Sequence, residues 1–291
     1  MNKFSYFEIF KNRYFINAEI ILQTPLHVGK GVSLKPIGTD LPVIKDAFDR
    51  PYIPGSSLKG VIRFQTERML RSIEKFKDKF GVKIMACDPL GDQCVNDEKR
   101  KKIKKELKEK YTKNGKFDEK TFEEAFLAEI WNNTCLACRI FGSQWFASRI
   151  YFKDAYLLNE GNFYKTEIRD GVAIDRDTGT AKSKMKYDYE VVPPGVKFKF
   201  EIILENMQDW EVGLICLVLK LWKEGQIGIG GKTSVGLGWG SLDKIRIEKI
   251  DLNKLVDFIF DPSKKDVLNF EDLLNVFKTK LEDQKNAQIQ T

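Results

Sequence analysis

The sequence of 291 residues predicts an α+β fold, and three observations lead to this prediction. Four segments are predicted as strands, 14–23, 149–158, 196–204 and 241–250, and apolar and polar residues alternate in all but the second. Two further segments, described below, have the apolar spacing of helices. Without two polar insertions the order is β-α-β-β-α-β, which is that of the ferredoxin-like fold and of the RNA-recognition fold. We therefore predict a ferredoxin-like (RRM-like) core.

Local signals define the helices. The first, over 55–76, follows Pro54, and Ser56 and Ser57 are its candidate N-caps. The second, over 209–224, begins with Asp209 as a possible cap. An amphipathic C-terminal helix is predicted from apolar residues at helical spacing, namely Val267, Phe270, Leu274, Phe277 and Leu281.

The two insertions divide the core into two parts, 1–77 and 149–250. Segment 78–148 is polar and charged and holds four cysteines, and segment 159–192, rich in Gly, Asp and Lys, is predicted as a projecting hairpin. Residues 251–291 complete the chain as a C-terminal helical segment.

The composition narrows the classes of function. With 49 Lys and Arg against 42 Asp and Glu, the net charge is +7, a mild indication of a polyanionic partner. The single His excludes zinc proteases, His-rich metal sites and His–His acid/base pairs. The N-terminus is no secretory signal, and the longest apolar stretch, Val212 to Leu219, is far shorter than the ~20 residues that span a bilayer. We expect a soluble, cytoplasmic protein with no membrane partner.

Segment 99–110, KRKKIKKELKEK, carries eight basic residues and has two interpretations. It is either a solvated helix face, on which Glu106 and Glu109 form internal pairs, or a patch that contacts phosphates. We favour the first slightly, because the interleaved glutamates dilute the positive field.

The five cysteines are an odd number, which argues against a disulfide framework. Cys135 and Cys138 form a CxxC pair, the spacing of half a zinc site, and Cys87 and Cys94 could supply the other half. Four thiolates would make a closed tetrahedral structural site. The spacing alone leaves zinc and four unrelated buried thiols equally open. Cys216 lies in an apolar segment and is predicted to be a core residue.

The stretch 225–240, GQIGIGGKTSVGLGWG, contains seven glycines, more than a turn requires. It is not a Walker loop, because five residues rather than four separate Gly225 from Gly231 and because it follows a helix and precedes a strand. Glycines let backbone N–H groups approach phosphates closely, so we favour a cradle for a nucleic-acid backbone over a tight structural connection. The contact residues would be Gly230, Gly231, Lys232, Thr233 and Ser234.

The start of the first helix is a second candidate anion site. A helix N-terminus offers free N–H groups and the positive end of the dipole, and Ser56, Ser57, Lys59 and Arg63 surround this one. The alternative is an ordinary capped helix with solvated basic residues.

Two residues between the first strand and this helix could carry chemistry. His27 follows the strand beside two glycines, although a lone His is more often structural. Asp40 lies in a loop bounded by Gly and Pro, where an ionised carboxylate could hold a divalent ion or position a ribose 2′-OH for attack on the adjacent phosphate. Composition alone favours a turn residue at this position.

Seven stretches together resemble the RAMP superfamily of CRISPR-associated proteins, and most of all the repeated Csm-type backbone subunit of type III effector complexes. The resemblance covers about residues 14 to 250. It depends on the combination, since any one of these motifs alone is weak. The stretches are HVGKG (27–31), DLPVIKD (40–46), YIPGSSLKG (52–60, with Arg63), CLACRIFGS (135–143), GVAIDRDTGTA (171–181), YEVVPPG (189–195) and GIGGKTSVGLG (228–238).

The resemblance implies a filament of several copies on one guide RNA, together with other type III subunits and a single-stranded target RNA. The insertion 78–148 would be a lid that carries zinc on its four cysteines, and residues 163–190 would be a thumb that reaches the next copy. Asp40 would cleave the target RNA with a divalent metal, Mg or Mn. The RNA-binding residues would be His27, Ser56, Ser57, Lys59, Arg63, Arg139 and the five contact residues of the glycine-rich loop.

One position departs from the family, and two alternatives stay open. Family members often carry Arg before the final Gly-x-Gly of the loop, and this chain has Val235, so one guide contact is in doubt. The subunit could bind guide RNA without cleaving. It could instead be a metal-independent ribonuclease that processes repeat RNA with His27 as base, although no Tyr or Lys partner lies near His27 in sequence.

Overall fold

The computed structural model describes residues 7–31, 39–113, 116–158 and 165–282. The strands are β1 (Asn12–Leu22), β2 (Thr112–Lys113), β3 (Lys116–Phe117), β4 (Ile150–Phe152), β5 (Glu167–Ile174), β6 (Ala181–Val191), β7 (Lys197–Glu205), β8 (Gly240–Asp251) and β9 (Asp266–Leu268). The helices are α1 (Gly55–Ser72), α2 (Asp97–Tyr111), α3 (Glu119–Asn133), α4 (Leu136–Phe141), α5 (Asp209–Lys223), α6 (Leu255–Phe260) and α7 (Phe270–Glu282). Short 3₁₀ helices cover Glu74–Phe80, Thr233–Val235 and Leu252–Lys254. The protein is thus a mixed α+β structure with antiparallel sheets.

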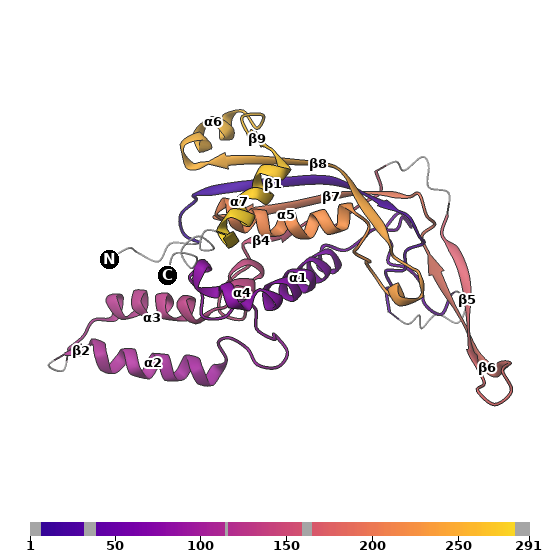
Figure 1. The fold of residues 1–291 in the computed structure, drawn as a ribbon, viewed down its shortest axis with the longest axis horizontal. Helices are drawn as coiled ribbons and strands as arrows, with labels where there is room; N and C mark the ends of the chain where they lie inside the picture. The colour runs from indigo at the N-terminus through magenta and orange to yellow at the C-terminus, as the bar shows by residue number, and fades with distance from the viewer. Residues whose placement is uncertain (1–6, 32–38, 114–115, 159–164, 283–291) are drawn as a thin grey trace, which may run out of the picture.

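The main sheet has the strand order β4-β7-β1-β8-β9, and every neighbouring pair is antiparallel. Every second residue of β1 from Tyr14 to Leu22 is buried, because side chains alternate between the two faces of a strand. Helices α1 and α5 lie on the same side of the sheet (Figure 1). The sheet buries one face against these helices, as the alternating sequence pattern predicts.

The second predicted strand is much shorter than expected. Only Ile150–Phe152 form a continuous ladder with β7, whereas the predicted strand covers 149–158. Beyond it, Ala155 forms a bridge with Ile53 and Leu157 forms one with Phe198. The regular ladder is interrupted at Ala155, whose backbone bonds to Ile53, while Lys153, Tyr156 and Leu158 on either side still bond to the backbone of β7.

Neither predicted side-chain cap is used. Helix α1 begins at Gly55 after Pro54, whose carbonyl accepts from the N–H groups of Ser57 and Leu58, and among the described residues no side chain caps the N-terminus of α1. The Asp154 carboxylate accepts the Gly55 N–H at 2.7 Å and takes the place that a serine cap would fill. Thus Ser56 and Ser57 are first-turn residues.

Helix α5 is capped one residue earlier than predicted. Gln208 is its N-cap residue, and the Glu211 carboxylate accepts the Gln208 N–H at 2.9 Å. Asp209 instead accepts hydrogen bonds from the Tyr14 hydroxyl and, at 3.3 Å, from Lys249. Cys216 is fully buried in this helix, as predicted.

The C-terminal helix α7 packs on α5 through the buried Leu273 and Phe277. A side chain at Gly213 of α5 would overlap the Leu273 carbonyl oxygen, so the glycine permits this close approach. Val267 does not belong to the helix: it lies in the edge strand β9 and is exposed, while α6 lies within the predicted helical segment 251–291 but was not predicted as a separate helix.

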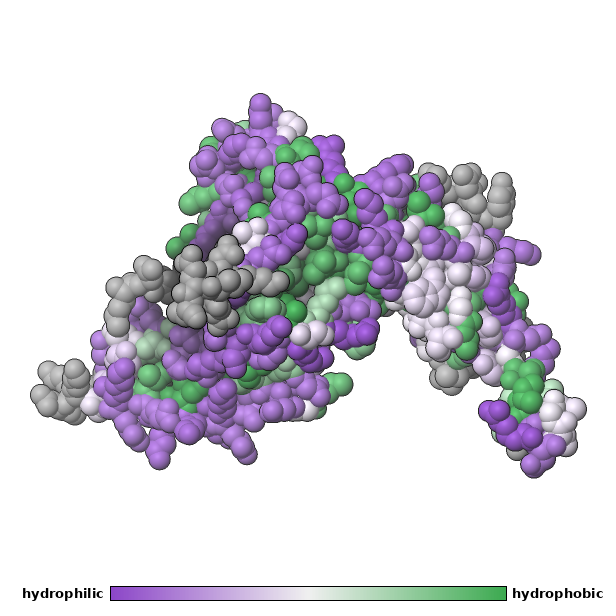
Figure 2. All heavy atoms as spheres, in the orientation of Figure 1, coloured by the Kyte–Doolittle hydropathy of each residue, from purple (hydrophilic) through white to green (hydrophobic). Residues whose placement is uncertain are grey.

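The two insertions extend in different directions from the sheet (Figure 1). Helices α2 and α3 pack side by side and are joined by the β2–β3 ribbon, and hydrophilic residues cover most of this end of the molecule on the face in Figure 2. Strands β5 and β6 form the predicted hairpin, with Gly171 opposite Tyr187. No helix in the described ranges is both long and apolar enough to span a membrane.

Candidate functional site

Three predicted site residues that are far apart in sequence meet at the base of the β5–β6 hairpin. His27 follows β1, Asp40 precedes α1, and Lys232 lies in the glycine-rich loop between α5 and β8. All three contact residues 187–190 of β6. We call this region the hairpin base.

His27 joins the hairpin to the glycine-rich loop. Its side chain is buried, with 8% of its surface exposed, and its Nδ1 lies 2.7 Å from the Glu190 carbonyl oxygen. Because a carbonyl only accepts, Nδ1 carries the proton of this bond. The His27 carbonyl in turn accepts the Gly231 N–H at 2.8 Å. His27 is therefore bonded to the hairpin through its side chain and to the glycine-rich loop through its main chain.

The glycine-rich loop requires glycine where the chain segments come closest. Gly230 has a φ of +81°, and a side chain there would overlap the His27 carbonyl oxygen. Lys232 also adopts the left-handed conformation, with a φ of 61°, and opens the short 3₁₀ turn that contains Thr233 and Ser234. Ser234 is exposed and Thr233 is half-buried. The loop thus places backbone and hydroxyl groups at the surface.

The Lys232 ammonium lies on two tyrosine rings of the hairpin. Its Nζ is 2.8 Å from the Tyr187 hydroxyl oxygen and 4.7 and 4.6 Å from the ring centroids of Tyr187 and Tyr189. Tyr187 crosses over Gly171 of the opposite strand, since a side chain at Gly171 would overlap its ring. The two tyrosines leave the lysine charge unneutralised while fixing its position.

Asp40 is exposed and is tied to Asp188 of β6. The Asp40 N–H donates to Asp188 Oδ1 at 2.6 Å, and the Asp188 N–H donates to Asp40 Oδ2 at 3.1 Å. Sequence reasoning missed Asp188, Tyr187 and the role of Tyr189. Tyr189 opens one of the quoted motifs, which was the one signal available for this strand.

Glu190, the last residue of the hairpin base, bonds β6 to residues outside this strand. It is buried, lies 2.7 Å from the Lys45 ammonium, accepts the Val43 N–H at 3.0 Å and bonds the Thr166 hydroxyl. Burial alone would raise the pKa of Glu190, but the hydrogen bonds from Lys45, Thr166 and Val43 outweigh it and lower the pKa. The carboxylate is therefore held in its ionised form.

The second candidate centre is the four-cysteine cluster. All four Sγ atoms are buried and lie within 4.8 Å of one another, and Cys87 Sγ is 3.6 Å from both Cys135 Sγ and Cys138 Sγ. Tetrahedral zinc with Zn–S bonds of about 2.3 Å separates its sulfurs by about 3.8 Å, so the arrangement fits this metal. The cluster could hold a structural metal such as zinc.

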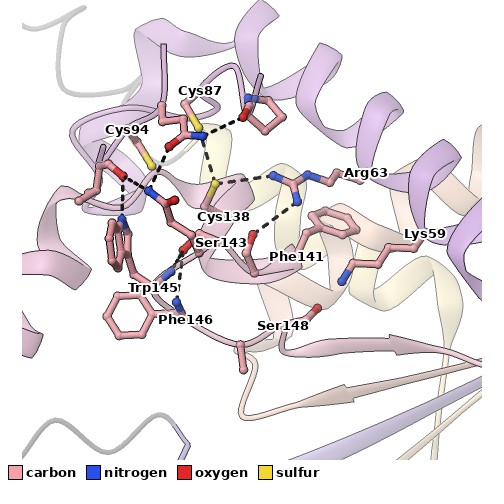
Figure 3. Close-up of a pocket in the computed structure, with 16 residues that line it drawn as sticks. Lys59, Arg63, Cys87, Cys94, Cys138, Phe141, Ser143, Trp145, Phe146 and Ser148 are labelled. Carbon is pink, nitrogen blue, oxygen red and sulfur yellow. Dashed lines mark hydrogen bonds between the residues drawn. The ribbon is translucent and has the colours of Figure 1, made fainter. Parts of the chain in front are cut away.

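The local structure places hydrogen-bond donors and a cation beside the cluster. Cys135 is the N-cap of α4, and its Sγ accepts the Cys138 N–H at 3.4 Å. Hydrogen bonding among the four sulfurs lowers the pKa of Cys87 and Cys94, whereas hydrogen bonding and burial raise the pKa of Cys135 and Cys138. The Arg63 guanidinium donates to Cys138 Sγ at 3.7 Å (Figure 3). A nearby cation stabilises the negative charge that metal ligands carry.

The remaining predicted RNA-binding residues lie away from the hairpin base. Lys59 and Arg63 line a cavity of about 430 Å³ beside the cluster (Figure 3), and burial, followed by the charge of Arg63, lowers the pKa of Lys59. Arg63 also pairs with Glu67 at 2.8 Å. Arg139 donates to the carbonyls of Thr134 and Trp131, at 3.1 and 3.0 Å, inside the insertion. Ser56 and Ser57 lie at the start of α1, beside β4.

The sequence of this chain is similar to those of known proteins. A family model described as "RAMP superfamily" matches residues 19–241, which include the hairpin base and all four clustered cysteines. The protein named "CRISPR system Cms endoribonuclease Csm3" from Methanocaldococcus jannaschii is 30% identical over 238 residues, 78% of this chain and 77% of its own. A protein of the same name from Methanothermobacter thermautotrophicus is 46% identical over 56 residues, 19% of this chain and 23% of its own.

Proposed function

Since this chain belongs to the RAMP superfamily, we propose that it is a backbone subunit of a type III CRISPR effector complex that binds guide RNA and cleaves the bound target RNA. The observation that carries the proposal is the hairpin base. An exposed carboxylate, Asp40, a fixed lysine, Lys232, and a glycine-rich loop are joined there through one strand. The name of the relatives, endoribonuclease, supports the same reaction class.

Guide RNA would be held mainly through its phosphates. The exposed backbone of the glycine-rich loop, the hydroxyls of Thr233 and Ser234 and the Lys232 ammonium are groups that bind phosphate oxygens. His27 acts beneath them by fixing the loop through its carbonyl. Specificity would then come from pairing between guide and target, and affinity would fall with salt.

Cleavage would use the carboxylate of Asp40. A bound Mg²⁺ or Mn²⁺ would neutralise charge on the scissile phosphate. Asp40 would orient this ion and the ribose 2′-OH. The 2′-oxygen would form a bond to phosphorus as the bond from phosphorus to the 5′-oxygen breaks, the 2′ proton would pass to solvent, and the leaving 5′-oxygen would take up a proton from solvent.

The remaining parts of the molecule take supporting roles. The ferredoxin-like core would consist of β1, β4, β7 and β8 with α1 and α5, from segments 1–77 and 149–250, and the antiparallel strand order supports this assignment. Residues 78–148 form a lid held by zinc, and residues 159–192 form a thumb that contacts the next copy. Residues 251–291 extend the core. The complex is cytoplasmic and also contains other type III subunits.

Replacement of Asp40 by Ala in the assembled complex tests the proposal. We expect cleavage of bound target RNA to fall by at least about 100-fold, because removing a group that acts in the transition state costs this order of rate, while guide RNA remains bound. Unchanged cleavage would leave only the alternative of a non-catalytic guide-binding subunit.

A second candidate function gains one supporting observation. Tyr189 lies edge-on to His27 at 6.1 Å, and Lys232 rests on Tyr189, so His27 has the neighbours that its local sequence lacks. A repeat-processing ribonuclease without metal would use these groups as acid and base. The burial of His27 argues against it. Cleavage of repeat RNA by the isolated chain in EDTA, lost in His27→Ala, would favour this function instead.

A further inference from the structure

Asp188 is a charged residue of the hairpin base that the proposed reaction leaves without a role. It lies on β6 between Tyr187 and Tyr189, and its carboxylate accepts the Asp40 N–H at 2.6 Å. In return its own N–H donates to Asp40 Oδ2 at 3.1 Å. The main chain of each aspartate therefore holds the carboxylate of the other. This reciprocal pair fixes where the Asp40 side chain points.

The attachment of the loop to β6 does not itself depend on the Asp188 side chain. The Leu41 N–H donates to the Asp188 carbonyl at 3.3 Å, and the Glu190 N–H donates to the Leu41 carbonyl at 3.0 Å. These main-chain bonds would remain if the Asp188 carboxylate were removed. Only the Asp40 N–H would lose its acceptor, and the orientation of the Asp40 residue would loosen.

We infer that Asp188 is a positioning residue for RNA cleavage, an inference that rests on the proposed function of Asp40. The Asp188 carboxylate accepts the Asp40 N–H and so fixes the Asp40 main chain, while the main-chain N–H of Asp188 donates to Oδ2 of Asp40. The other oxygen, Oδ1, has no hydrogen bond to any residue the structure describes and would be available to the reacting groups. A carboxylate held in this way is prepared before the RNA arrives, and a displacement of about 1 Å can cost about 100-fold in rate.

The role that we infer for Asp188 requires an acceptor oxygen rather than a charge. Asn in its place still offers a carbonyl oxygen to the Asp40 N–H, whereas Ala offers nothing. A residue that bound the metal ion directly would need its negative charge and would be poorly replaced by Asn. The pair of substitutions therefore separates positioning from ligation.

The hairpin also offers a matched control. Asp170 lies directly opposite Asp188 in the register of β5 and β6 and forms an ion pair with Lys186 at 3.0 Å. Asp170→Ala removes the same carboxylate from the same hairpin, and no described bond joins Asp170 to Asp40.

The experiment uses complexes assembled on guide RNA in which every copy carries Asp188→Ala, Asp188→Asn, Asp170→Ala or Asp40→Ala. Cleavage is measured with excess target RNA at saturating Mg²⁺. We expect Asp188→Ala to lower kcat by about 10- to 100-fold with KM nearly unchanged, because substrate binding does not involve the Asp40 N–H. Asp188→Asn and Asp170→Ala should stay within about threefold of the wild type.

Four other outcomes would overturn the inference, and each points to a different explanation. A normal kcat for Asp188→Ala, with Asp40→Ala inactive, removes the positioning role and leaves the proposed function intact. Equal losses in Asp188→Ala and Asp188→Asn show that the charge is needed. Loss of guide RNA or early unfolding of the Asp188→Ala complex shows a structural role. Full cleavage by Asp40→Ala overturns the proposed function together with the inference.

Discussion

Several glycines of the glycine-rich loop adopt a backbone conformation that other residues adopt only at a cost in stability. Gly238 has a φ of +74°, donates its N–H to the Pro25 carbonyl at 2.7 Å, and would overlap the Ile229 carbonyl oxygen if it carried a Cβ. Gly236, two residues earlier, has a φ of +92°, but nothing lies within 4 Å of where its Cβ would be. The two glycines share the left-handed conformation and differ in the space around them.

We predict that Gly238→Ala lowers the free energy of unfolding more than Gly236→Ala does. At Gly236 the substitution costs the left-handed conformation alone, about 1–2 kcal/mol. At Gly238 it must also displace the backbone near Ile229, which we expect to raise the cost to about 3 kcal/mol or more. Chemical denaturation of both variants measures the difference, and equal losses would contradict the close packing of the loop.

Among the elements, those with strict alternation can be predicted from sequence and those defined by tertiary contacts cannot. Strands β1, β7 and β8 match their predicted segments closely, because one buried face imposes a period of two on them. The regular ladder of β4 is interrupted where Ala155 bonds to Ile53, although the residues on either side still bond to β7. Val267 has helical spacing to Phe270, yet pairing with β8 places it in a strand. These outcomes depend on distant backbone groups, which local patterns do not contain.

The element with the clearest testable consequence is α4, which presents half of the cysteine cluster. We predict that the purified protein contains one zinc ion per chain. Cys138→Ser should lose this ion and lower the unfolding temperature, because metal bound only to the folded state stabilises it. Elemental analysis and thermal unfolding, with and without a chelator, measure the two effects.

Cys216→Ser is the matched control for the zinc prediction. It removes a thiol that is fully buried in α5 and outside the cluster, so it should perturb packing and keep the metal. Zinc retained in Cys138→Ser, or absent from the wild type, would contradict a structural metal site.

At the scale of the whole molecule, the sequence predicts which residues matter better than it predicts where they meet. Asp40, His27 and Lys232 were candidates for separate reasons, and the fold joins them through β6. The partner Asp188 is separated from Asp40 by 148 positions, and its contact is set by how the hairpin leaves the core. Lys59, Arg63 and Arg139 were expected beside RNA, but each contacts or lines the region around the cysteine cluster and α4. The spacing of residues along the sequence does not show which distant residues meet in the folded protein.

Basic residues that could contact RNA lie in two separate parts of the molecule. The basic helix α2 and the hairpin base with Lys232 lie at opposite ends in Figure 1. The sequence favoured a solvated face for α2 because Glu106 and Glu109 were expected to pair with its lysines. In the described ranges, no such ion pair was found. The location of a charge, rather than the total of +7, should therefore decide its effect on guide RNA binding.

We predict that Lys232→Ala weakens guide RNA binding and flattens its salt dependence, whereas Lys104→Ala, the same loss of charge on the exposed face of α2, does neither. Each phosphate neutralised on a single strand adds about 0.7 to the slope of log affinity against log salt, so Lys232→Ala should reduce the slope by about 0.7. Binding isotherms at several salt concentrations measure the slopes. Equal changes in both variants would mean that the guide responds to overall charge, and a changed slope in Lys104→Ala alone would place the RNA on α2, far from the glycine-rich loop.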